Sequence, residues 1–195
     1  MAVRAHGWTR EEAIWGVLLG HEGVEHMLPV NFYYDDILKL LAATGTHWTP
    51  TLPLVFGHLP EDSPLRTAML SMVKRAYQAG VQLLAGTDSL NLGDEYGQAL
   101  NVELQNFAQA GIPPLEVLRI ATEHSAAMVG AGNLLGSLEP GKLADIVLLD
   151  GNPLDNIANT LTVSKVVLGG RVFEERQPLT VNGGEDVIGS RTSSS

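Results

Sequence analysis

The sequence predicts an α/β fold, and two regularities indicate it. Short apolar runs typical of β-strands alternate with helical segments over roughly the first two thirds of the 195 residues, a pattern typical of parallel β-α-β packing. Four strand–helix units follow one another at about 31 residues each, the spacing found in a (β/α)8 TIM-type barrel of about 250 residues. After Gly130 the pattern changes to short strands separated by turns that contain Gly and Pro. We therefore expect half of such a barrel, followed by a small β unit.

The first two strand–helix units are expected near the N-terminus. Thr9 and Glu12 have the spacing of a capping box, which predicts the start of the first helix. Asp35 can cap the second helix, whose apolar residues form a helical stripe. The predicted elements are, in order, a strand over residues 1–5, a helix over 9–19, a strand over 23–26 and a helix over 35–45.

The next two units follow the same alternation. Ser63 before Pro64 predicts a helix that begins with an N-cap and a proline in its first turn. A nearly continuous apolar run predicts a buried strand, which ends at a Gly-Thr-Asp-Ser sequence. The predicted elements are strand and loop over 46–54, a helix over 63–80, a strand over 81–85, and helices over 96–110 and 114–129.

The C-terminal third predicts a small β unit. Gly169 and Gly170 form a turn between two short apolar runs, as expected for a hairpin. Strands are expected over 143–149, 165–168 and 171–173. We divide the chain into a half barrel of four βα units over 1–130, a small β unit over 131–181 and a flexible tail over 182–195, which is polar and rich in Gly and Ser.

Composition excludes several classes of protein. The hydrophobic share of 45% and the charged share of 17% describe a globular chain that can bury a core. The net charge of −10 disfavours nucleic-acid binding, and the absence of cysteine excludes disulfides and cysteine-ligated metals. No apolar run reaches the roughly 18 residues of a membrane span, and the N-terminus lacks a signal-peptide pattern. We expect a cytoplasmic protein with no membrane or nucleic-acid partner.

Three predicted strands end in residues that can bind metal: His6, His26 and Asp88. They are spaced about one and two βα units apart, and the carboxyl ends of parallel barrel strands converge on one mouth. Two imidazoles and a carboxylate suit zinc or another divalent ion, and a carboxylate beside water can act as a general base. The alternative is structural, with hydrogen-bonded histidines and Asp88 capping the turn that follows its strand. The residues alone leave both interpretations open.

Several longer motifs resemble the amidohydrolase superfamily. Gly23-Val24-Glu25-His26 is similar to the sixth-strand motif of the imidazolonepropionase-like branch, and the resemblance covers about residues 1–175. The other motifs that carry it are Ala-Gly-Thr-Asp at 85–88, the segment at 97–104, the segment at 110–122 and the segment at 135–150, which begins Leu-Gly-Ser-Leu-Glu-Pro-Gly-Lys. The resemblance implies the C-terminal half of the barrel, strands 5–8, plus part of a small composite β-sandwich.

The resemblance also implies roles for individual residues. It assigns His26 as the sixth-strand metal ligand, and Asp88 as the eighth-strand ligand and general base, with zinc or another divalent ion as the cofactor. The fifth-strand pattern often reads His-x-His-Gly, and here Arg4 stands at the first histidine. Because Arg4 and His6 share one strand face, and a longer loop over 19–22 can absorb the difference, we assign the fifth-strand ligand to His6.

The expected function is that of a metal-dependent hydrolase of C–N bonds other than peptide bonds. Amides, cyclic amides and peptide-like small molecules are the expected substrates, with ester hydrolysis as a side activity. The family's first-strand His-x-His and fourth-strand bridging Lys or Glu would lie upstream of this chain, so we expect either a truncated product or a stand-alone gene fragment. The alternative is a non-catalytic fragment that acts as an oligomerisation module or is completed by a partner. Half a barrel exposes two strand edges, so we expect a homodimer or higher oligomer.

Overall fold

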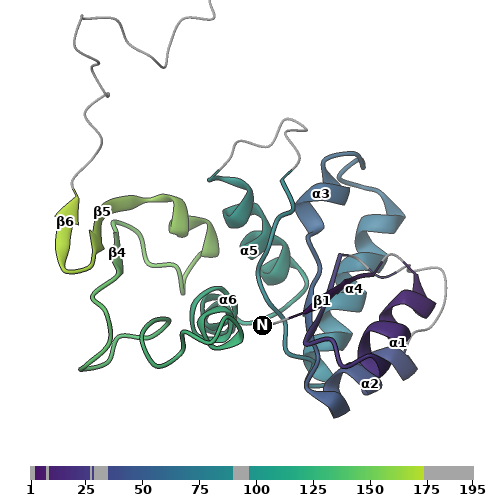
Figure 1. Cartoon of the computed structure of the whole chain (residues 1–195). Helices are drawn as coiled ribbons and strands as arrows, with labels where there is room; N and C mark the ends of the chain where they lie inside the picture. Colours follow the sequence, from purple (N-terminus) through teal and green to yellow (C-terminus); the bar gives the residue numbers. More distant parts are fainter. Residues whose placement is uncertain (1–2, 8, 27, 29–34, 90–96, 174–195) are drawn as a thin grey trace, which may run out of the picture.

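The computed structural model describes residues 3–7, 9–26, 28, 35–89 and 97–173, and it confirms an α/β fold (Figure 1). Three short strands form a parallel sheet in chain order, β1-β2-β3. The predicted strand over 81–85 is reduced to an isolated parallel bridge between Trp48 and Leu83, at the far side of β3. The strands are β1 (Arg4–His6), β2 (Gly23–Glu25) and β3 (His47–Thr49).

Backbone hydrogen bonds extend this parallel arrangement beyond the strand ends. The Gly7 N–H donates to the carbonyl of Glu25 at 3.1 Å, and the His26 N–H donates to the carbonyl of Thr49 at 2.9 Å. The Leu84 N–H donates to the carbonyl of Trp48, also at 2.9 Å. All four segments therefore run side by side in the same direction, so their carboxyl ends lie at one edge.

Helices follow each parallel segment, as the alternating pattern predicts. Thr9 Oγ1 accepts from the Glu12 N–H at 3.2 Å while the Glu12 carboxylate accepts from the Thr9 N–H at 2.9 Å, which confirms the capping box. Ser63 caps its helix ahead of Pro64, also as predicted. The long helices are α1 (Arg10–Leu18), α2 (Asp35–Thr44), α4 (Pro64–Gln78) and α5 (Ala99–Gln109).

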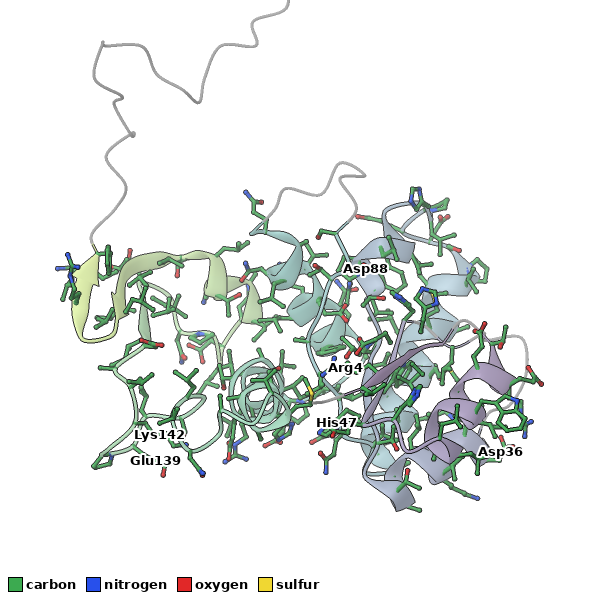
Figure 2. All side chains as sticks on the ribbon, in the orientation of Figure 1. Arg4, Asp36, His47, Asp88, Glu139 and Lys142 are labelled. Carbon is green, nitrogen blue, oxygen red and sulfur yellow. The ribbon has the colours of Figure 1, made fainter. Side chains whose placement is uncertain are left out.

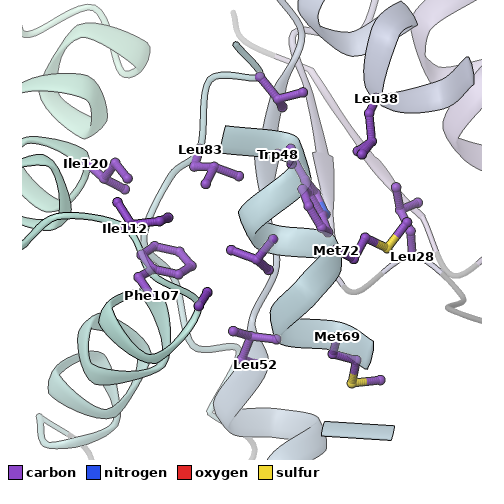
Figure 3. Close-up of a cluster of buried hydrophobic side chains, with 14 of the residues drawn as sticks. Leu28, Leu38, Trp48, Leu52, Met69, Met72, Leu83, Phe107, Ile112 and Ile120 are labelled. Carbon is purple, nitrogen blue, oxygen red and sulfur yellow. The ribbon is translucent and has the colours of Figure 1, made fainter. Parts of the chain in front are cut away.

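A continuous apolar core joins the strands to these helices (Figure 3). Trp48 is fully buried in it, and its indole N–H donates to the carbonyl of His26 at 2.7 Å. Gly16 of α1 lies so close to β1 that an added Cβ would stand 2.6 Å from the Cβ of Ala5. Dense packing of this kind gives the sheet edge a rigid support.

One predicted boundary was wrong. Residues 52–54 were expected to belong to a strand and loop, but they open a short helix, α3 (Leu52–Phe56). The reason is tertiary, because a carboxylate from α5 accepts the first backbone N–H of α3. The helix predicted over 114–129 is confirmed as one continuous helical segment over 114–128, whose middle turn is π-helical. Its parts are α6 (Pro114–Arg119), η1 (Ile120–His124) and α7 (Ser125–Met128).

The C-terminal strands form a separate antiparallel sheet in the order β4-β5-β6, with the predicted turn at Gly169 and Gly170. A 3-10 turn, η2 (Ile157–Leu161), packs on α5, and Ile157 joins the main core. The proposed boundary near residue 130 stays a prediction, and the predicted tail over 182–195 lies outside the described residues. The strands are β4 (Ile146–Leu149), β5 (Val163–Leu168) and β6 (Arg171–Phe173).

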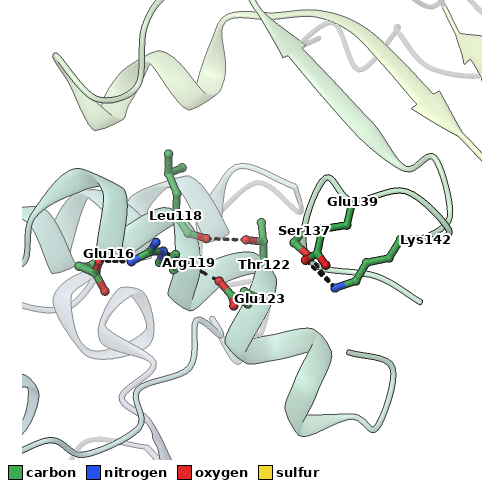
Figure 4. A network of polar contacts seen from close by, with 8 residues as sticks. All are labelled: Glu116, Leu118, Arg119, Thr122, Glu123, Ser137, Glu139 and Lys142. Carbon is green, nitrogen blue, oxygen red and sulfur yellow. Dashed lines mark hydrogen bonds and ion pairs between the residues drawn. The ribbon is translucent and has the colours of Figure 1, made fainter. Parts of the chain in front are cut away.

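Polar contacts organise the connection between the two sheets (Figure 4). Lys142 donates to the hydroxyl of Ser137 and lies 3.4 Å from a carboxylate oxygen of Glu139. On the preceding helix, Arg119 pairs with Glu116 at 2.8 Å. The Ser137–Lys142 turn belongs to a motif that carried the family resemblance, and its contacts here are structural. In the described ranges, no helix combines the length and apolar character needed to cross a membrane.

Candidate active site at the strand ends

A cavity of about 530 Å³ lies at the carboxyl-terminal edge of the parallel sheet. His6, His26 and Asp88, the three predicted site residues, all line it, together with Arg4 and Glu25. In Figure 2, Asp88 lies at one end of the strand bundle, whereas His47, the first residue of β3, lies at the other. The structure therefore brings the three predicted residues into one cavity.

The position of His26 depends on a turn of the backbone directly after β2. His26 has a φ of 74°, a left-handed conformation that is uncommon for a residue other than glycine. A regular strand would place Glu25 and His26 on opposite faces, but with this turn both line the cavity. The bonds of His26 to Thr49 and Trp48 hold the turn in place. Conformations of this kind concentrate at functional sites.

His6 lies directly against His26. Their ring centroids are 4.3 Å apart, and the rings meet edge to face with an interplanar angle of 67°. Arg4 also faces the cavity, which agrees with the prediction that Arg4 and His6 share a face. The Arg4 guanidinium, however, pairs with the Glu25 carboxylate and contacts the sulfur of Met128. Of the two candidates for the fifth-strand position, His6 is therefore the one adjacent to His26.

Asp88 approaches His26 from the fourth parallel segment. Its carboxylate Oδ2 lies 3.6 Å from His26 Nδ1, and its side chain is 39% exposed, so it faces both the histidine and the open cavity. Asp88 also has a left-handed backbone, with a φ of 48°. An added Cβ on Gly86, two residues earlier, would stand 2.6 Å from a methyl group of Thr49. This close approach lets the Asp88 segment lie directly on β3.

The electrostatic environment favours the neutral form of His26. Burial lowers the pKa of its imidazole, and the neighbouring His6 lowers that pKa further. The carboxylates of Asp88 and Glu25 act in the opposite direction but are the smaller influences. A neutral imidazole retains a lone pair, which is the form that accepts a proton or binds a metal ion.

Two further residues support the site, and sequence reasoning missed both. The Thr51 hydroxyl lies 3.1 Å from His26 Nδ1. Behind it, the Leu52 N–H donates to Glu103 Oε2 at 3.1 Å, and Glu103 is fully buried. The sequence does indicate that the Glu103 carboxyl group is buried, because Glu103 falls between Ala99 and Phe107 at four-residue spacing on the apolar stripe of its helix.

The donor chemistry of the cavity suits a divalent ion, but a complete ligand group is not formed. Two imidazoles and a carboxylate are typical zinc ligands, and the lowered pKa of His26 favours the neutral form that binds a metal ion. Within the described part of the chain, however, no three His, Asp or Glu side chains are arranged so that they could hold a metal ion. Metal binding by His6, His26 and Asp88 therefore stays a prediction.

Known proteins resemble this chain in sequence. A model described as the amidohydrolase family matches residues 1–173. A 5-methylthioadenosine/S-adenosylhomocysteine deaminase from Syntrophobacter fumaroxidans is 28% identical over 187 residues, 86% of this chain. The imidazolonepropionase of Micrococcus luteus is 31% identical over 159 residues, 77% of this chain.

The similarity extends to solved structures. The crystal structure of Aspergillus niger ochratoxinase superimposes with a TM-score of 0.71 at 26% identity, covering 89% of this chain and 42% of that chain. The sequence matches cover 40% of the deaminase and 39% of the imidazolonepropionase. The chain thus spans about two fifths of the length of these curated relatives.

Proposed function

The chain belongs to the amidohydrolase family, and on that basis we propose that it is a metal-dependent hydrolase module for C–N bonds in small molecules. The observation that carries this proposal is the meeting of His6, His26 and Asp88 in one cavity at the ends of parallel strands. The names of the relatives support it, since they include a deaminase and an imidazolonepropionase. Amides, cyclic amides and peptide-like compounds are the proposed substrates, with esters as a side activity.

Each side chain has a proposed part in the reaction. His6, His26 and Asp88 would hold a divalent ion, zinc being the simplest choice for this donor set. When bound, such an ion supplies Lewis acidity, which activates water and polarises a carbonyl group. Asp88, exposed to the cavity, accepts the proton of the attacking water and passes it to the departing nitrogen. Burial lowers the pKa of His26 and so favours its neutral, metal-binding form.

The fold is proposed to be the C-terminal half of a (β/α)8 barrel, strands 5–8. Support comes from four parallel segments that lie side by side in chain order, each followed by a helix. The antiparallel sheet β4-β5-β6 is proposed to be part of a composite β-sandwich. Its side chains fit this role, since Val147, Val166 and Phe173 are register partners on one face of the sheet and all three are exposed. Apolar surface of this kind is typical of a face that packs on another element.

Hydrolysis assays test the proposed activity. We expect the zinc-supplemented chain to turn over members of a panel of amides, cyclic amides and dipeptides, and to lose that turnover after dialysis against a chelator. Amide or cyclic-amide hydrolysis that zinc restores would support the proposal. If no member of the panel is hydrolysed with zinc present, the non-catalytic alternative is favoured. The incomplete ligand group is the observation that speaks for that alternative.

Self-association is a second expectation. Among the described residues, β1 pairs only with β2, and the segment around Leu83 pairs only with β3, so both outer edges carry unpaired backbone groups. Such edges pair readily with further strands, and two-fold assemblies are the commonest homo-oligomers. We expect sedimentation equilibrium at micromolar concentrations to give the mass of a dimer or higher oligomer. A monomer over the whole concentration range would contradict this expectation.

A further inference from the structure

A carboxyl group is buried behind the candidate site without belonging to the cavity. Glu103 of α5 has no exposed surface, and it is absent from the cavity lining. Burial raises the pKa of Glu103 well above its usual range, whereas the N–H of Leu52 favours the ionised form. The amide of Asn106 lies beside it, although in the described part of the chain neither Glu103 Oε1 nor Asn106 Nδ2 makes a hydrogen bond of normal geometry. An acid in such a place is costly to bury, which suggests a specific task.

The role of Glu103 follows from its hydrogen bond to the backbone of a neighbouring helix. Its Oε2 accepts the N–H of Leu52 at 3.1 Å, at the start of α3. The preceding residue, Thr51, is 3% exposed and has a φ of 53°. A left-handed backbone is strongly disfavoured for a β-branched residue, and it persists only where surrounding contacts impose it. The bond from Leu52 to Glu103 is such a contact, directly next to the strained residue.

The strained residue in turn contacts His26. Thr51 Oγ1 lies 3.1 Å from His26 Nδ1, and the Asp88 carboxylate lies 3.6 Å from the same nitrogen. The Asp88 carboxylate favours the tautomer that carries its proton on Nδ1. In that tautomer, Nδ1–H donates to the Thr51 hydroxyl and Nε2 keeps its lone pair. In metal sites, a partner of this kind on the second ring nitrogen orients the histidine and sets its tautomer.

We propose that Glu103 is a positioning residue for the site: by holding the start of α3, it keeps Thr51 where its hydroxyl orients His26 and sets the ring's tautomer. The chain of contacts runs from the buried face of α5 to the cavity through Leu52 and Thr51. The proposal deepens the proposed function, since the use of His26 as a ligand rests on that function. The orientation of the ring itself does not depend on any activity.

The test compares four variants of the full chain. Glu103→Met fills the same space but cannot accept the Leu52 N–H, Glu103→Gln keeps an acceptor, and Thr51→Val removes only the hydroxyl. Leu104→Ala is the matched control, because Leu104 is a buried neighbour on α5 that belongs to the apolar core. Two quantities are measured: the His26 tautomer, by ¹⁵N NMR of the histidine side chains without metal, and the affinity for zinc alone, by calorimetry.

The expected pattern separates positioning from stability. E103M and T51V shift His26 away from the Nδ1–H tautomer and weaken zinc binding by about 10- to 100-fold, whereas E103Q keeps both properties. Leu104→Ala lowers the melting temperature without changing the tautomer. The proposal is overturned if E103M leaves the tautomer unchanged, or if Leu104→Ala changes it equally.

Two safeguards keep the test decisive. If the wild-type chain binds no zinc, the proposed function fails, but the tautomer in metal-free protein still decides the role of Glu103. If E103M does not fold, it is repeated in a Thr51→Gly background, because glycine adopts the left-handed conformation without support. Restored folding there supports the first step of the proposal, the support of the left-handed backbone at residue 51 by Glu103, and continued failure to fold contradicts that step. Thr51→Val tests the second step, the effect of the hydroxyl on the His26 tautomer.

Discussion

Replacing Asp88 with asparagine is expected to lower kcat/KM for a C–N bond substrate by about 10²- to 10⁴-fold, the usual contribution of a general base. Asparagine has nearly the same size but cannot take the proton of the attacking water. The melting temperature should change little, because asparagine tolerates the left-handed backbone found at this position and the Asp88 side chain is 39% exposed. Steady-state kinetics on the zinc-loaded protein, together with a thermal melt, measure both effects.

A matched control separates the role of Asp88 from a general effect of removing negative charge. Asp155 is an exposed aspartate in the C-terminal unit, between β4 and β5. Asp155→Asn should leave kcat/KM unchanged within experimental error. If the Asp88→Asn protein retains hydrolysis at the wild-type rate with metal bound, Asp88 is not the base.

Replacing His26 with alanine is expected to remove most of the bound metal. We expect elemental analysis of dialysed wild-type protein to find close to one divalent ion per chain or less, as for a single zinc site. The content should fall strongly in His26→Ala and Asp88→Ala, and also in His6→Ala, because each variant removes one donor from an already incomplete group.

His47 offers the control for this experiment. It stands at the first residue of β3, at the opposite end of the strand from the cavity edge, and its Nδ1 lies 3.0 Å from the carbonyl oxygen of Glu22. His47→Ala removes a histidine from the same sheet without touching the cavity, so its metal content should equal that of the wild type. Equal metal content in all variants would contradict the ligand assignment.

Much of the fold was predictable because its signals are local. The capping box of Thr9 and Glu12 and the Ser63-Pro64 start depend on residues within one helical turn, and both helices begin where predicted. The alternation of apolar strands with amphipathic helices likewise predicts a parallel arrangement from chain order alone. The α3 helix was missed because the group that accepts its first N–H lies on α5, about fifty residues further along the chain.

The candidate site, like the fold, was predictable from the sequence only in part. Sequence by itself determined which residues stand at strand ends, and therefore that His6, His26 and Asp88 meet at one edge of the sheet. Only the tertiary structure decided that Glu25 and His26 face the same cavity, because a backbone turn at His26 interrupts the alternation of the strand. It alone also decided that Thr51 contacts His26 and that Glu103 stands behind it. Strand ends follow from local pattern, whereas a left-handed backbone at a non-glycine residue is stabilised by contacts between distant segments, which no local pattern encodes.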